Sequence, residues 1–190
     1  MPSLEKRFRS GLSFDEMVAV AKSNVDLYGS VRARANPPTE YAARIERTGR
    51  QWHFLVLSED WCGDAVNIVP WVDALAISSS NLDMRIIARD ENLDLMDQHL
   101  TNGKSRSIPV VLLLDESYVE RAWWGPRPQA LQEWATGAEA QAMEKDARYR
   151  ELRRWYARDR GQSILEEITG MVERVAAQDR GDVATLKAAV

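Results

Sequence analysis

The chain has 190 residues, of which 45% are apolar and 28% are charged, so it is expected to fold into one globular core with additions and is neither disordered nor fibrous. Its net charge of -4 gives no general attraction to nucleic acid or to anionic lipid, and we expect neither as a partner. No apolar stretch has the length of a signal peptide or a membrane span, and the single cysteine excludes an internal disulfide, which together predict a cytoplasmic protein.

A pair of helices is predicted before the core. The first begins after Ser13, an N-cap candidate whose capping-box partner is Glu16, and its apolar residues continue to about Gly29. After a proline-rich break, the second helix is expected over residues 39–47. We assign residues 1–50 to an N-terminal helical segment packed on the core.

The core is predicted to be α/β, with a central four-stranded mixed sheet flanked by helices. Strands are expected at residues 52–57, 83–88, 110–114 and 118–124, and the two helices of the β-α-β-α unit at residues 66–75 and 92–100. The run after Pro109 is apolar throughout, which suits a strand buried on both faces. A last core helix near Leu131 ends the core, so we place the core at residues 51–137 and a C-terminal helical extension at residues 138–190.

The residues that carry chemistry are concentrated at 58–65, S-E-D-W-C-G-D-A, where a buried strand passes into a helix. Trp61, Cys62 and Gly63 match the W-C-x-x-C motif of the thioredoxin superfamily, which this chain resembles. The resemblance extends to Pro70, five residues after the motif, to the R-S-I-P sequence that ends at Pro109, and to Gly125 after the last hairpin. It implies a thioredoxin fold with a cis-proline opposite the reactive sulfur.

The wording E-D-W-C-G-D, followed by R-D-E-N and G-P-R-P, is similar to a bacterial branch of thioredoxin-like proteins whose motif reads W-C-G-D-C. Ala65 stands where that branch has its second cysteine, and Val56 stands where thioredoxins have a buried aspartate. Because the chain has one thiol, dithiol chemistry is not expected. The resemblance implies Cys62 as the catalytic residue and a substrate-binding set of Trp61, Gly63, Asp64, Ile108 and Pro109.

The position of Cys62 at a helix N-terminus predicts an exposed and acidic thiol, because unpaired N–H groups and the helix dipole stabilise a thiolate. Three nearby carboxylates oppose this effect, and we expect water and salt to screen them. The thiol is therefore predicted to be modestly more acidic than that of a free cysteine.

Three functions remain open at this point. In the first, Cys62 exchanges disulfides as a monothiol with a protein or small-molecule partner such as glutathione, and an external thiol completes the cycle. In the second, the groove beside Pro109 and Trp61 is a redox-inactive binding site for a peptide or a small ligand. The third is a metal-cluster scaffold, in which two Cys62 thiolates share a cluster across a homodimer.

The other candidate residues are interpreted as structural. His53 and His99 have no cysteine or histidine at zinc-ligand spacing, so we expect no metal and no cofactor. Arg127 lies in the G-P-R-P turn, with contact to an anionic ligand as the alternative. The basic and aromatic stretch 145–160 is interpreted as a solvated helix whose aromatic residues dock on the core, and not as a nucleic-acid site.

Overall fold

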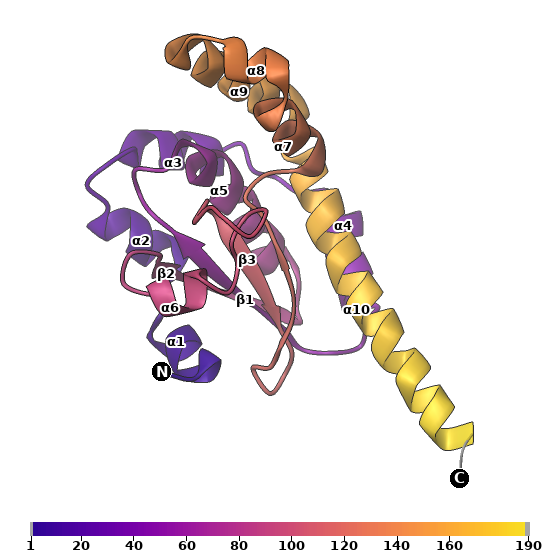
Figure 1. Cartoon of the computed structure of the whole chain (residues 1–190). Coiled ribbons are helices and arrows are strands. Elements are labelled where there is room, and N and C mark those ends of the chain that lie inside the picture. Colours follow the sequence, from indigo (N-terminus) through magenta and orange to yellow (C-terminus); the bar gives the residue numbers. More distant parts are fainter. Residues whose placement is uncertain (1, 189–190) are drawn as a thin grey trace.

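The computed structural model describes the backbone of residues 2–188 and the side chains of residues 2–181 (Figure 1). Its centre is a four-stranded mixed sheet in the order β2-β1-β3-β4, flanked by helices, which confirms the predicted fold class. The strands are β1 (Trp52–Ser58), β2 (Leu82–Ala88), β3 (Val110–Leu114) and β4 (Glu120–Trp124). β1 pairs in parallel with β2 and antiparallel with β3, and β3 pairs antiparallel with β4.

The two central strands are buried along their whole length. All seven residues of β1 and all five residues of β3 are buried, since both faces of the sheet are covered at its centre. Val56 of β1 lies opposite Val111 of β3 and is fully buried, so an apolar side chain fills the position at which the resemblance implies an aspartate. The core below the turn that carries Cys62 is therefore apolar at this position.

The helix that follows this turn is α5 (Gly63–Ser78), which contains Pro70. Its middle is apolar on nearly every face, because it lies between the sheet and the helices around it. A second crossover helix, α6 (Leu93–Met96), is shorter than the nine residues expected from the sequence at 92–100.

The N-terminal segment contains four helices and not the predicted pair. They are α1 (Leu4–Ser10), α2 (Phe14–Val20), α3 (Val25–Arg32) and α4 (Thr39–Glu46). The expected capping box of Ser13 and Glu16 is present at the start of α2. The helix predicted to continue to about Gly29 is interrupted because the backbone N–H groups of Lys22 and Ser23 bind Asp60, and Asn24 is left-handed at φ 56°.

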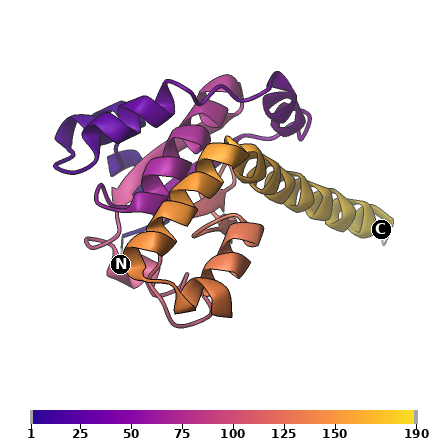
Figure 2. The same cartoon turned by 90° about the horizontal axis from the view of Figure 1, so that it is seen from above.

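The C-terminal region, in its described part, is made of helices joined by short turns. It consists of α7 (Gln129–Thr136), α8 (Ala138–Ala142), α9 (Lys145–Asp159) and α10 (Gln162–Ala188). The first half of α10 packs on α4 and α5, and its later turns project from the core in both views (Figures 1 and 2). Although α10 has 27 residues, neither it nor any other described helix is long and apolar enough to cross a membrane.

The turn between α9 and α10 is fixed against α5. Arg160 and Gly161 are both left-handed, at φ 52° and 77°, and a Cβ atom on Gly161 would overlap the ring of Trp71. A side chain cannot be accommodated here, since the backbone conformation and the indole both exclude it. The turn therefore holds the end of α9 against α5, and α10 begins there and runs along α4.

Replacing Gly161 by alanine is expected to lower the free energy of unfolding by about 3 kcal/mol, through backbone strain and overpacking against Trp71. The matched control is Gly170→Ala within α10, where only the flexible end of Arg174 is close and helix propensity favours alanine. Urea unfolding followed by circular dichroism measures both variants. Equal stability of Gly161→Ala and the parent chain would contradict the tight contact with Trp71.

Candidate functional site

Cys62 is the N-cap residue of α5, and its sulfur faces the first turn of that helix. The Sγ atom accepts a hydrogen bond of 3.5 Å from the backbone N–H of Ala65, which is one of the unpaired donors at the helix start. The absent second motif cysteine would belong at Ala65, and Ala65 is fully buried. The thiol therefore sits at the strand-to-helix junction, as the motif predicts.

The sulfur is also held from the side of β3. The thiol donates a hydrogen bond of 3.4 Å to the backbone carbonyl of Ile108, and the Ile108–Pro109 peptide bond is cis. Gly125 approaches this strand closely at φ 134°, where a Cβ atom would overlap the carbonyl oxygen of Pro109. The two residues before β3 and the residue after β4 therefore lie close together beside Cys62.

Cys62 is only 9% exposed, which corrects the expectation of an exposed, acidic thiol. Burial is the largest influence and raises the pKa of the Cys62 thiol, and the carboxylate of Asp64 raises it further. The Ala65 N–H and the Arg127 guanidinium lower this pKa but do not outweigh burial. The sequence-based prediction of the thiol pKa was wrong because it included the effect of the helix N-terminus and of solvated carboxylates but not the burial of the thiol.

Asp64, the second residue of α5, is clasped by two side chains from later in the chain. Arg127 donates to its Oδ2 at 2.6 Å, and the hydroxyl of Tyr156, from α9, donates to its Oδ1 at 2.8 Å. Asp64 raises the pKa of the Arg127 guanidinium against the effect of burial, and burial together with Asp64 raises the pKa of Tyr156 well above its usual value. We call these three residues the Asp64 clasp.

The other acidic residues of the motif are also used by the fold. Glu59 accepts a hydrogen bond of 2.8 Å from the backbone N–H of Asp90, and Asp60 accepts 2.6 Å and 3.2 Å bonds from the loop between α2 and α3. Trp61 is different, since half of its surface (51%) is exposed and the guanidinium of Arg89 lies 5.0 Å from its ring centroid. Trp61 and Gly63 are the exposed residues of the motif.

Four of the candidate site residues lie close together, and one of them, Asp64, is already engaged by other side chains. Cys62 lies beside Ile108 at hydrogen-bond distance, and Gly63 and Asp64 follow it on α5, while the oxygens of Asp64 are already engaged by the clasp. Tyr156 was missed, because 92 residues separate it from Asp64 and nothing local in the sequence links them. The one available signal was its place among the aromatic residues of 145–160, which were expected to dock on the core.

Neither histidine approaches Cys62 through a hydrogen bond. The ring of His99 bonds the carbonyl of Leu95 and Glu120, and His53 stacks on Tyr118 at 4.4 Å between ring centroids. In the part of the chain whose side chains are described, no group of three histidine, cysteine or acidic side chains could hold a metal ion.

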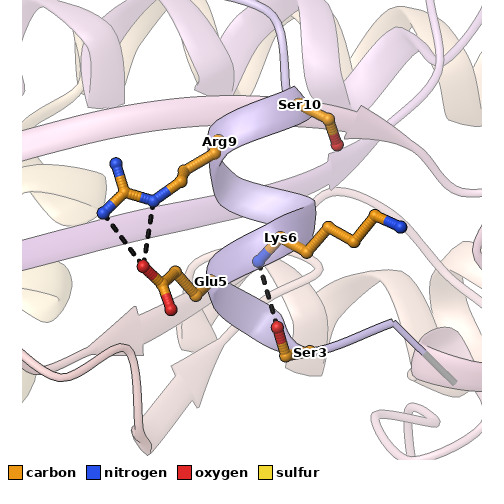
Figure 3. Close-up of a pocket in the computed structure, with 5 residues that line it drawn as sticks. All are labelled: Ser3, Glu5, Lys6, Arg9 and Ser10. Atoms are coloured by element: carbon orange, nitrogen blue, oxygen red, sulfur yellow. Dashed lines mark hydrogen bonds and ion pairs between the residues drawn. The ribbon is translucent and has the colours of Figure 1, made fainter.

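A shallow surface pocket of about 380 Å³ lies elsewhere, on α1 (Figure 3). It is lined by Ser3, Glu5, Lys6, Arg9 and Ser10. Two of its contacts are local to the helix, since Glu5 pairs with Arg9 at 2.9 Å and Ser3 caps the helix through the backbone N–H of Lys6. This pocket belongs to the end of α1 and contributes no residue to the Cys62 site.

Comparison with known proteins supports the same fold. A family model described as Thioredoxin matches residues 11–156. A crystal structure of a protein of unknown function from Pseudomonas aeruginosa is similar at a TM-score of 0.73 and 23% identity, over 91% of this chain and 98% of the other. The crystal structure of an HIV epitope scaffold is similar at a TM-score of 0.72 and 20% identity, over 90% of this chain and 98% of the other. No curated protein matches the chain.

Removal of the Tyr156 hydroxyl is expected to increase the alkylation rate of native Cys62 by iodoacetamide about fivefold. The variant Tyr156→Phe keeps the buried ring but loses the bond to Asp64, worth about 1 kcal/mol, so α9 opens more often. The matched control is Tyr149→Phe on the same helix, since Tyr149 is 43% exposed and the Lys145 ammonium lies 6.0 Å from its ring centroid. Identical rates for Tyr156→Phe and the parent would show that α9 does not limit access to the thiol.

The pH dependence of alkylation follows from the raised pKa of Cys62. Because the thiolate is the reacting form, the midpoint of rate against pH is expected to lie higher for the folded chain than for the same chain unfolded in urea. Because the fold favours the neutral thiol, the free energy of unfolding is also expected to fall as the pH rises through the range in which the thiol loses its proton. A folded-state midpoint at or below the unfolded one would contradict the role of burial.

Proposed function

The chain belongs to the thioredoxin family, and we propose that it acts within this family as a monothiol that exchanges disulfides through Cys62. The observation that carries the proposal is the placement of Sγ at the start of α5, 3.5 Å from the Ala65 N–H and 3.4 Å from the Ile108 carbonyl. A sulfur at a helix start has a donor ready for the thiolate. The lone cysteine also suits a reducing compartment, and a cytoplasmic location is part of the proposal.

The reaction needs one external thiol, for which we propose glutathione. The Cys62 thiol loses its proton to solvent, and the thiolate attacks the glutathione sulfur of a mixed disulfide on a substrate. The new bond joins Sγ to that sulfur, the substrate S–S bond breaks, and the substrate thiolate leaves and takes up a proton. The thiolate of a second glutathione then attacks this new disulfide, which yields oxidised glutathione and restores Cys62.

The residues around the sulfur have separate parts in this proposal. The Ala65 N–H and Arg127 both lower the pKa of Cys62 and would hold the thiolate once the site is open. Trp61 offers its exposed face to the substrate beside the sulfur, while Ile108 and Pro109 are buried and back the sulfur on the side of β3. Asp64 binds the clasp and not the substrate, so its proposed role is to keep the site closed at rest.

A second candidate function is a redox-inactive binding module that uses the surface beside Pro109 and Trp61. A specific observation favours it: Cys62 is buried, its pKa is raised, and its S–H already has an acceptor at Ile108. In this role the thiol would be an apolar part of the wall, and the partner would be a peptide or a small ligand.

The variant Cys62→Ser separates the two functions. We expect it to reduce turnover of a glutathionylated peptide by excess glutathione to the rate without protein, because serine cannot form the mixed disulfide. The assay is a coupled measurement of oxidised glutathione. Turnover by Cys62→Ser equal to the parent chain, or none by either, would exclude monothiol exchange and leave the binding module.

A further inference from the structure

The exposed side of α9 carries a row of arginines. Arg150, Arg154 and Arg158 are four residues apart and Arg153 lies beside them, so that all four share one side of the helix, and all four are exposed. Leu152 and Tyr156 are buried on the opposite side, since an offset of two residues turns a helix by about 200°. We call these four residues the arginine row.

The charges of the arginine row are largely uncompensated. Arg154 pairs with Glu151 at 2.5 Å, whereas the other three form no ion pair with any side chain that the structure describes. Arg44 is an example of the opposite arrangement, since it pairs with both Glu166 and Glu173. In a chain whose net charge is -4, four exposed arginines on one side of a helix form a local group of positive charge.

We propose that the arginine row is the docking surface for an acidic segment of a protein substrate. Guanidinium groups at i, i+4 and i+8 repeat about every 6 Å along the helix, which matches carboxylates on alternate residues of an extended segment or four apart on a helix. Bidentate pairs between arginine and carboxylate give such a contact direction as well as strength.

A protein partner is favoured over a nucleic acid by the charges around the row. Asp146 and Glu151 lie on the same helix, and their carboxylates would repel a continuous phosphate backbone while an acidic peptide can place its charges between them. The net charge of the chain works against a long polyanion in the same direction.

The row is connected to the Cys62 site through its own helix. The buried side of α9 holds Tyr156 in the Asp64 clasp, and Cys62 contributes to the raised pKa of Tyr156, so a segment bound on the outer side lies across this helix from the clasp. That the docked protein is a substrate of Cys62 rests on the proposed function, whereas the docking itself does not.

Docking is tested with a fluorescein-labelled peptide of alternating glutamate and serine, followed by anisotropy at low and at physiological salt. The triple variant Arg150→Glu, Arg154→Glu, Arg158→Glu is expected to bind it at least about tenfold more weakly than the parent. The matched control, Lys6→Glu, Arg34→Glu, Lys104→Glu, changes net charge equally at exposed positions outside α9 and should keep the parent affinity. Equal loss in both variants would reduce the effect to net charge and overturn the proposal.

Two further probes identify the partner. A labelled single-stranded oligonucleotide that binds more tightly than the peptide, and loses binding in the α9 variant, would replace the protein partner by a nucleic acid. The acidic peptide with a glutathionylated cysteine, compared with a glutamine-for-glutamate version, tests delivery to Cys62, and faster exchange of the acidic peptide supports it. Row-dependent binding without exchange would leave docking standing and remove the proposed function. Equal exchange of both peptides, with binding unchanged in the α9 variant, would remove docking alone.

Discussion

The arrangement around the thiol depends on one partly buried carboxylate. Asp64 stands at the start of α5, and its two oxygens are satisfied by Arg127, from the turn after β4, and by Tyr156, from α9. A carboxylate taken out of water is costly unless it is paired and hydrogen-bonded, so each of these contacts requires the other segment to be in place. Three segments far apart in the sequence are thereby joined two residues from Cys62.

This arrangement shows a balance between access and stability of the thiolate. A helix start lowers the pKa of a cysteine, and in an open site that effect would govern Cys62. In this chain burial outweighs the effect of the helix start, and the Ile108 carbonyl accepts a hydrogen bond from the neutral thiol. Arg127 and the Ala65 N–H both lower the pKa of Cys62, so they would favour the thiolate once water reaches the sulfur. Reactivity in such a site depends both on access to the sulfur and on the pKa of the thiol.

The parts of the structure that could be predicted from the sequence are those decided locally. The strand at residues 110–114 has the predicted bounds, and the capping box of Ser13 and Glu16 forms as expected, because an apolar run and a cap each depend on neighbouring residues. The break in the N-terminal helix depends on Asp60, some 37 residues later, and the raised pKa of Cys62 depends on burial under distant segments. No pattern of neighbouring residues contains such information, and Tyr156 was missed for the same reason.

The turn at Arg160 and Gly161 ties the C-terminal helices to the helix that starts at Cys62. Its backbone is left-handed at both residues, and a Cβ atom on Gly161 would overlap the ring of Trp71, which belongs to α5. Tyr156 of α9 reaches Asp64 in the first turn of the same helix. α9 is therefore attached to α5 at two points, and the ion pairs of Arg44 with Glu166 and Glu173 attach α10 to α4. The C-terminal helices are for this reason an integral part of the fold and not a separate appendage.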